Sequence, residues 1–273
     1  MLAIGAEMVS ECAPVERAQA IYRSFLERVP YENLSNNRSV TESPDDPENW
    51  PRATDRLLRE NADLGLGGTS FSLAYALRDL LRGAGLTAHT TLGYNLVTEQ
   101  AHAAVIVYVD QGPLLYDPAM LMSGPVPVRP GGVLEDPLGE ICLEPRCGPT
   151  LTVTIRMHGG QPTPREPGDE IWHAPTDDQG VRPVYSIIPV PAPPQSYRQA
   201  WLASFYRGRT MPLRLACRRN DEIIRYGERP GTIEVLRADG RHEIELGEDP
   251  AAQLHELFGI GEDCLREWFE RRR

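Results

Sequence analysis

The segment Gly65-Leu66-Gly67-Gly68-Thr69-Ser70-Phe71 places a hydroxyl side chain directly after a glycine-rich turn and before an apolar run with helical spacing. That spacing predicts a helix over residues 70–81, which Gly83 and Gly85 end. The N-terminus of a helix offers free backbone N–H groups and the positive end of the helix dipole, so it stabilises a developing negative charge. Ser70 is therefore a candidate nucleophile.

Two further side chains follow at strand ends. His102 opens an apolar strand expected over residues 103–109, and Asp117 ends a strand expected over 114–116, with residues 110–113 as the turn between them. A hairpin brings these two strand ends together, so the Asp could hold the far nitrogen of the imidazole. The chain order of nucleophile, base and orienting acid is the set of roles that acyl transfer needs.

Each of these residues also has a plainer interpretation. Ser70 could be only the N-cap of its helix. Asp117, which precedes Pro118, could be a turn residue. His102 could be a hydrogen-bonded residue at a strand end. The order and spacing of all three together favour catalysis over these separate structural roles.

The rest of the chain divides into helical, β-rich and mixed segments. Residues 14–29 have helical spacing, residues 35–51 are polar and Pro-rich and indicate a loop, and a short helix follows at 53–61. Three stretches have the composition of strands, at 87–94, 151–157 and 184–190, and a Pro/Gly-rich stretch at 159–180 indicates a long loop. The remaining predictions are a helix at 196–206, a β meander from 213 to 246, and helices at 250–258 and 262–271.

Composition excludes several classes of function. The chain has 273 residues, a net charge of −11 and a pI near 5.1, which argues against nucleic-acid binding and against adsorption to anionic membranes. All 28 basic residues are arginines, so Schiff-base chemistry, a Ser-Lys dyad and a P-loop lysine are excluded.

Five cysteines, an odd number, occur without a recognisable signal sequence or membrane-spanning run, so the cytoplasm is the expected location. Cys142 and Cys147 have no second Cys/His pair at zinc spacing nearby, and no metal is expected.

Four short motifs, in the right order along nearly the whole chain, resemble the arylamine N-acetyltransferase family. Val29-Pro30-Tyr31-Glu32-Asn33-Leu34 is similar to that family's Pro-Phe-Glu-Asn-Leu signature, and Leu66–Phe71 lies where the family has Arg-Gly-Gly-x-Cys-Phe. His102 and Tyr116-Asp117 match the His and Asp of the family's Cys-His-Asp triad. Leu254–Ile260 is similar to its closing Leu-x-x-x-Phe-Gly-Ile stretch.

The departures from that pattern occur at and around the expected catalytic residues. Ser70 stands at the position of the nucleophilic Cys, and Leu66 stands where the family has Arg, so Glu32 must find another partner or face solvent. Ser72-Leu73-Ala74 follows Phe71 where Glu/Gln-Leu-Asn is usual, and Asp117-Pro118-Ala119-Met120-Leu121 replaces Asp-Val-Gly-Phe-Gly. A single Cys→Ser substitution would change one residue only. Because the residues around position 70 also differ from the family pattern, Ser70 is interpreted as the natural residue.

The resemblance implies an α+β fold with three parts around a papain- or transglutaminase-like core. These are an N-terminal helical bundle (residues 1–86) carrying Ser70, a central β-barrel (87–190) carrying His102 and Asp117, and a C-terminal α/β lid (191–273). It also implies acetyl-CoA or another acyl thioester as co-substrate, with no tightly bound cofactor, and it places Tyr31 and Phe71 beside the acyl pocket, where core packing is the competing interpretation.

The function expected from these residues is transfer of an acyl group from a thioester, on CoA or on an acyl carrier protein, to a small-molecule amine. Ser70 would carry the acyl group, His102 would be the general base and Asp117 its orienting partner. A serine hydroxyl stays protonated where a thiol ionises beside a His, so it depends on that base. Two alternatives stay open: a catalytically silent binding protein of the same fold, and an amide synthase, cyclase or acyl hydrolase of a natural-product pathway.

Two geometric expectations follow. Ser70 should begin its helix within one side-chain rotation of His102, whose far nitrogen should lie about 2.6–3.2 Å from an Asp117 oxygen. A mainly apolar cleft between the β-rich middle and the C-terminal segment should open onto Ser70, with a few polar groups converging there.

Overall fold

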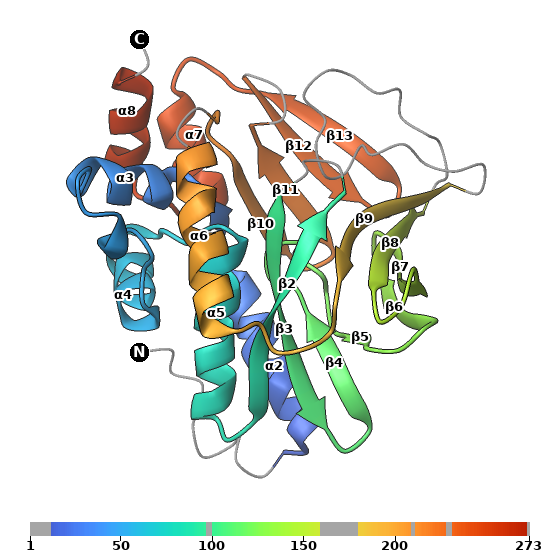
Figure 1. Cartoon of the computed structure of the whole chain (residues 1–273). Coiled ribbons are helices and arrows are strands. Elements are labelled where there is room, and N and C mark those ends of the chain that lie inside the picture. The colour runs from blue at the N-terminus through green and yellow to red at the C-terminus, as the bar shows by residue number, and fades with distance from the viewer. Residues whose placement is uncertain (1–11, 97–99, 159–179, 209–210, 228–230, 272–273) are drawn as a thin grey trace.

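Helices pack against two antiparallel sheets in a computed structural model that describes residues 12–96, 100–158, 180–208, 211–227 and 231–271 (Figure 1). The fold is α+β, as predicted. The helices are α2 (Pro14–Arg28), α3 (Leu34–Glu42), α4 (Thr54–Leu64), α5 (Ser70–Gly83), α6 (Pro194–Gly208), α7 (Pro250–Phe258) and α8 (Glu262–Glu270), with a 3₁₀ turn η1 (Pro47–Asn49).

The larger sheet has eight strands and is nearly closed into a barrel. Its order is β5-β4-β3-β2-β9-β8-β7-β6, and the two edge strands β5 and β6 contact each other. The strands are β2 (Thr87–Asn95), β3 (Ala101–Val109), β4 (Gly112–Tyr116), β5 (Val126–Pro127), β6 (Gly132–Asp136), β7 (Gly139–Pro145), β8 (Leu151–Met157) and β9 (Val181–Ile187).

Strand β3 explains how this sheet is buried on both faces. Ala103, Val105 and Val107 belong to the core shared with the helices, whereas Ala104 and Ile106 belong to the core inside the barrel. Because successive side chains of a strand point to opposite faces, one continuous apolar run supplies both cores.

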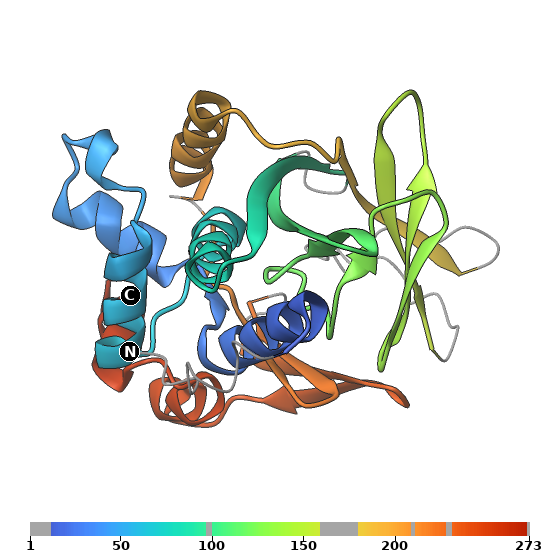
Figure 2. The ribbon, with the colours of Figure 1, turned by 90° about the horizontal axis from the view of Figure 1, so that it is seen from below.

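The second sheet has the order β1-β10-β11-β12-β13 and joins distant parts of the chain. Its strands are β1 (Tyr31–Glu32), β10 (Leu215–Arg219), β11 (Glu222–Tyr226), β12 (Thr232–Arg237) and β13 (Gly240–Glu245). Only β1 comes from the N-terminal part. Figure 2 shows α2 and α7 beside this sheet, with the barrel further along the molecule.

Helix α5 lies at the centre of the molecule, between α6 and α2 in the view from below (Figure 2). It packs on β2 and β3 as well as on α2 and α4. Its side chains are buried on several sides, including Phe71, Leu73, Leu77 and Leu81. A helix that is apolar around most of its circumference belongs in a core, so the N-terminus of α5 is held rigidly.

The prediction of a loop at residues 35–51 was wrong, because this polar stretch contains most of α3 and the turn η1. Leu34 and Val40 are the only large apolar residues of α3, so the segment lacks a helical pattern. Strands β5, β6 and β7 were also not predicted, and β9 begins three residues before the expected strand. The predicted loop at 159–180 lies, except for Gly180, outside the described residues.

The predicted boundaries near residues 86 and 190 fall in the connections from α5 to β2 and from β9 to α6. The division into three domains stays a prediction, and β1 shows that the N-terminal part contributes a strand to the C-terminal sheet.

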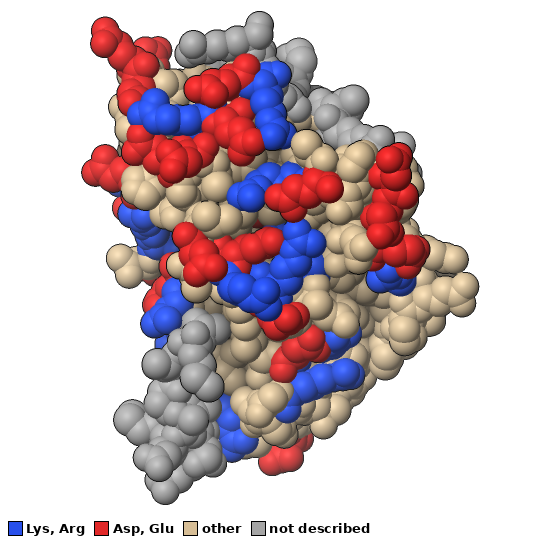
Figure 3. Space-filling model, turned by 90° about the vertical axis from the view of Figure 1, so that its left-hand side faces the viewer, with Lys and Arg blue, Asp and Glu red and all other residues tan. Residues whose placement is uncertain are grey.

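The helical face carries charges of both signs in close alternation, as Figure 3 shows from the left-hand side of Figure 1. Ion pairs account for the pattern: Arg38 and Arg56 both reach Glu42, and Arg266 reaches Asp249 and Glu262. Interspersed pairs of this kind cancel locally, so the described residues of this face present no extended basic surface to a polyanion.

Candidate active site

Ser70 is the first helical residue of α5, as predicted, and Thr69 is the N-cap. The Thr69 side chain makes no capping hydrogen bond, and its Oγ1 accepts a hydrogen bond from Asn36 Nδ2 at 3.4 Å. The interpretation of Ser70 as merely an N-cap therefore fails. The backbone N–H groups of the first helical turn have no intrahelical acceptor, which makes this position suited to an oxyanion.

Two glycines allow the chain to enter α5 along a neighbouring strand. A Cβ atom on Gly67 would lie 1.7 Å from the carbonyl oxygen of Pro30, and one on Gly68 would lie 2.7 Å from Cβ of Ser72. The approach leaves room for backbone hydrogen bonds from Gly68 N to Pro30 O at 3.3 Å and from Glu32 N to Gly68 O at 3.0 Å. The nucleophile candidate is thus fixed by main-chain contacts on its N-terminal side.

His102 and Asp117 are joined by the hairpin of β3 and β4. Val105 of β3 pairs with Tyr116 of β4, and Asp117 comes directly after Tyr116. The strand register therefore determines where Asp117 lies relative to β3. His102 Nε2 lies 2.7 Å from Asp117 Oδ2, within the predicted range. The other oxygen, Oδ1, accepts hydrogen bonds from the backbone N–H groups of Ala119 and Met120, both at 3.0 Å. Asp117 is therefore both a turn residue and the partner of the imidazole.

Ser70 and His102 line the same cavity, although no hydrogen bond joins them in the part of the chain that the structure describes. Because Nε2 of His102 faces Asp117, its Nδ1 is the nitrogen left to accept a proton from a nucleophile. Both side chains are largely buried, at 8% exposure for Ser70 and 6% for His102. The three predicted residues thus converge on one place, and their catalytic roles stay a prediction.

Tyr185 and Tyr22 surround the pair of His102 and Asp117. The ring of Tyr185 lies 4.5 Å from the His102 ring, centroid to centroid, and Tyr22 donates a hydrogen bond to the backbone oxygen of Asp117 at 2.9 Å. Burial, followed by the negative charge of Asp117, raises the pKa of both tyrosines well above the ordinary value. Both phenols therefore stay neutral, and the Asp117 carboxylate is fully buried beside aromatic side chains.

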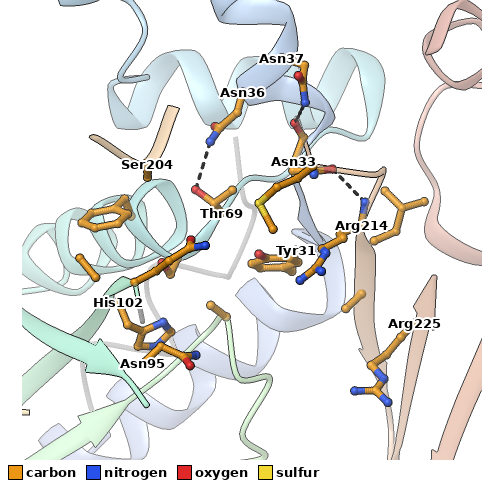
Figure 4. A pocket seen from close by; sticks show the side chains of 18 of the residues that line it. Tyr31, Asn33, Asn36, Asn37, Thr69, Asn95, His102, Ser204, Arg214 and Arg225 are labelled. Atoms are coloured by element: carbon orange, nitrogen blue, oxygen red, sulfur yellow. Dashed lines mark hydrogen bonds between the residues drawn. The ribbon is translucent and has the colours of Figure 1, made fainter. Parts of the chain in front are cut away.

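The cavity lies between the barrel, α3, α5 and the second sheet, and its empty space, open solvent included, is about 1100 Å³ (Figure 4). Tyr31 and Phe71, the two predicted lining residues, both border it. Phe71 also belongs to the core, where its backbone oxygen accepts a hydrogen bond from the Tyr197 hydroxyl at 2.7 Å. Its contribution is therefore divided between packing and the cavity wall.

Amide side chains are the feature of the cavity that the sequence interpretation missed. Asn33 is the N-cap of α3, and Asn36 and Asn37 lie in that helix, whereas Asn95 ends β2 and Gln100 precedes β3. The wall also contains Arg214 and Arg225 and, among the described residues, no carboxylate. The expected cleft is present, and these polar groups lie in its wall beside apolar side chains. The close spacing of asparagines just after Glu32 was the available signal in the sequence.

Glu32, which was predicted to lack its usual partner, is fully buried. Its Oε2 accepts a hydrogen bond from Ser35 N at 2.7 Å, and its Oε1 lies 3.8 Å from Nη2 of Arg52. The charge that Leu66 cannot supply comes from a residue 14 positions earlier in the chain.

No group of three or more His, Cys, Asp or Glu side chains within the described ranges could hold a metal ion. The helices in those same ranges are all too short or too polar to cross a membrane.

Comparison with known proteins gives a fold and no close relative. No family model matches the chain, and neither does any curated protein. Solved structures of arylamine N-acetyltransferases do match. The enzyme from Mycobacterium marinum is 16% identical with a TM-score of 0.70, over 95% of this chain and 93% of that one. The same enzyme in complex with CoA is 17% identical with a TM-score of 0.69, over the same shares of the two chains.

An arylamine N-acetyltransferase from Bacillus cereus, described as having a Cys-His-Glu catalytic triad, is 14% identical with a TM-score of 0.66, over 92% of this chain and 93% of that one. The chain therefore has the arylamine N-acetyltransferase fold over nearly its whole length. Identities this low show the fold alone.

Proposed function

We propose that the protein is a divergent relative of the arylamine N-acetyltransferases that moves an acyl group from a thioester to an amine through an ester on Ser70. One observation carries the proposal. A His-Asp pair joined at 2.7 Å and a serine at a helix N-terminus border one cavity, in a fold whose solved examples are acetyltransferases.

The geometry supports a two-step reaction. Ser70 Oγ attacks the thioester carbonyl carbon while Nδ1 of His102 takes the hydroxyl proton, and Asp117 stabilises the imidazolium through Nε2. The oxyanion is stabilised by backbone N–H groups at the start of α5. The C–S bond then breaks, and His102 returns the proton to the departing thiolate. In the second step the amine attacks the ester carbonyl, His102 takes the amine proton, and the proton returns to Ser70 as the C–O bond breaks.

Acyl-CoA is the donor that we propose, because the similar enzyme from M. marinum binds CoA in its solved structure. Arg214 and Arg225 border the cavity, and Arg225 is paired there with the buried Glu234. The comparisons give no support to an acyl carrier protein as the donor. The amine acceptor is proposed as a small arylamine on the same likeness. We propose the cytoplasm as the location, since none of the five cysteines, all of them among the described residues, forms a disulfide.

A second candidate function is binding without catalysis. Ser70 and His102 share no hydrogen bond in the described part of the chain, and the amide-rich cavity could hold a polar ligand without transforming it. Amide synthesis, cyclisation or acyl hydrolysis would use the same Ser70 ester and differ only in the group that accepts the acyl chain.

The test is covalent labelling. The purified protein is incubated with a panel of acyl-CoA and simpler acyl thioesters, and its intact mass is measured with time. We expect an adduct at Ser70 that Ser70→Ala abolishes, and we expect His102→Ala to slow its formation by roughly 10²-fold or more, because the hydroxyl then lacks its base. Absence of any adduct, together with saturable binding of a thioester, would replace transfer with the binding function.

A further inference from the structure

The side chain of Arg52, in the segment between α3 and α4, reaches the turn ahead of Ser70. It is 1% exposed, among the most completely buried large side chains of the protein. Its Nη2 donates a hydrogen bond to the carbonyl oxygen of Gly67 at 2.6 Å, and its Nη1 donates one to Glu60 Oε2 at 2.8 Å. Burial of an arginine is costly unless its charge and its donors are both matched, so this placement needs a reason.

Two carboxylates match the charge. Glu60 on α4 is partly buried and also binds Arg56 at 2.7 Å, whereas Glu32 on β1 is fully buried and lies 3.8 Å from Nη2 of Arg52. The guanidinium group therefore lies between β1, α4 and the glycine turn. Its planar fork donates to the Gly67 carbonyl and to the Glu60 carboxylate in fixed directions, with Glu32 at ion-pair distance, which an ammonium group could not match.

The guanidinium also shapes the turn sterically. A Cβ atom on Gly68 would lie 2.8 Å from Nη2 of Arg52, so the glycine backbone packs directly on the charged group. On its other side the same turn is hydrogen-bonded to Pro30 and Glu32. The peptide between Gly67 and Gly68 is thus held from two sides, three residues before the nucleophile candidate.

We propose that Arg52 is a positioning residue for the nucleophile turn, fixing the Gly67 carbonyl and through it the direction in which Ser70 and the first N–H groups of α5 face the cavity. The positive charge at this turn is that of Arg52, which lies outside the segment 65–71. Within that segment, Leu66 is apolar and is buried in the core around Leu254 and Ile260. The catalytic consequence rests on the proposed acyl transfer, and the structural consequence does not.

The test compares Arg52→Met, Arg52→Lys and the control Arg59→Met. Arg59 is on the surface of α4, one residue before Glu60, and its described ion pair is with Asp55. For Arg52→Met we expect the rate constant of Ser70 acylation to fall roughly 10- to 100-fold, with the half-saturating thioester concentration within about twofold of the parent, since a small displacement of a reacting group has such an effect. Arg52→Lys should recover part of the rate, and Arg59→Met should keep the parent rate.

Amide hydrogen exchange supplies a readout without substrate. In Arg52→Met the peptides covering residues 65–72 should exchange at least tenfold faster than in the parent, while the barrel strands β2 and β3 keep their protection. If the parent forms no acyl adduct, the proposed function fails, and the exchange result alone decides the role of Arg52. A folded Arg52→Met with parental acylation and parental exchange at 65–72 would overturn the inference, as would a change confined to thioester affinity.

Glu60→Gln covers the case in which Arg52→Met does not fold. It removes the negative charge that faces Nη1 of Arg52 at a partly exposed site, and we expect the same two changes at smaller size. A folded Glu60→Gln in which neither the acylation rate nor the exchange at 65–72 changes would also contradict the inference.

Discussion

Asp117 uses its two carboxylate oxygens for two different tasks. Oδ1 is held by the backbone N–H groups of Ala119 and Met120, which leaves Oδ2 to meet Nε2 of His102. A carboxylate fixed in this way cannot rotate with the imidazole, so it sets the ring orientation as well as its proton position. Leu121, in the same turn, adopts a positive φ of 55°.

Ser70→Cys is the most informative single substitution at the site. A thiolate needs less help from a base than a hydroxyl does, so if the cavity keeps the geometry of its Cys-containing structural relatives, acylation should rise about tenfold or more. The measurement is the acylation rate from intact mass, with Ser70→Ala as the control for background modification. A lower rate for Ser70→Cys would instead show a site rebuilt around the shorter C–O bond.

The catalytic candidates could be predicted from the sequence because their roles depend on local context. A glycine turn before a helix and a hairpin between His102 and Asp117 are visible in short segments. Arg52 could not be predicted, since its contacts to Gly67 and Glu32 depend on how three elements meet. The amide wall was missed for the same reason, because asparagines in α3 face a cavity that only the second sheet completes.

At the scale of elements, α4 and α7 end in the same way, and they provide a matched pair of substitutions. Gly65 and Gly259 are the two C-caps, with φ of 67° and 71°. A Cβ on Gly65 would lie 1.9 Å from the Gly259 carbonyl oxygen, whereas one on Gly259 would meet open space. Gly259→Ala should cost about 1–2 kcal/mol of unfolding free energy from the backbone conformation alone, and Gly65→Ala clearly more.

Urea denaturation of both variants measures the difference. Equal losses would show that the two helix ends can separate without cost, which would contradict the tight contact between the α4 and α7 ends.

The charge cluster at α4 predicts a pH dependence of stability. Burial alone would raise the pKa of Glu60, but Arg52 and Arg56 outweigh burial and hold that pKa below its ordinary value. A group with a lowered folded pKa stabilises the protein fully above its unfolded pKa, about 4.3 for Glu, and loses that contribution as the pH falls through the folded value. Glu60→Gln should therefore lower the unfolding free energy at pH 7 by roughly 2 kcal/mol, and less as the pH falls below about 4.

Asp55→Asn is the control for this prediction, since it removes an exposed pair on the same helix and should change stability little. A Glu60→Gln deficit that stayed constant from pH 7 to pH 3 would mean that Glu60 contributes through packing and not through its charge.

Short elements mark the limit of what the sequence predicts at this scale. Strands β1 and β5 have two residues each, too few for any periodicity, and α3 is a helix because Leu34, Ser35, Asn36 and Ser39 are buried by its neighbours. Tertiary packing, and not propensity, decides such elements.

At the scale of the whole molecule, one buried ion pair joins the two sheets. Arg218 on β10 donates through Nη2 to both oxygens of Asp136 on β6, each at 2.9 Å, and the two side chains are almost fully buried. Arg218 also donates to the backbone oxygen of Leu121, beside the turn that holds Asp117. The second sheet is thereby connected to the barrel near the site.

Arg218→Met should lower the unfolding free energy by about 3–5 kcal/mol, because it leaves a buried carboxylate without its partner. The double variant with Asp136→Asn should recover part of that loss. Chemical denaturation measures both, and a loss below about 1 kcal/mol for the single variant would show that water replaces the guanidinium and that the sheets are coupled by other contacts.

The pairing of β1 with β10 has a practical consequence for protein engineering. Tyr31, Leu215 and Ala216 form one wall of the cavity, and the register places Tyr31 opposite Ala216 and Glu32 opposite Leu215. On its other edge, Tyr31 bridges to Gly68. The distance between the wall and the nucleophile turn is thus fixed by the spacing of a backbone ladder. Side-chain substitutions on this wall would change the polarity of the cavity. Only insertion or deletion of residues would change the distance between the wall and the nucleophile turn.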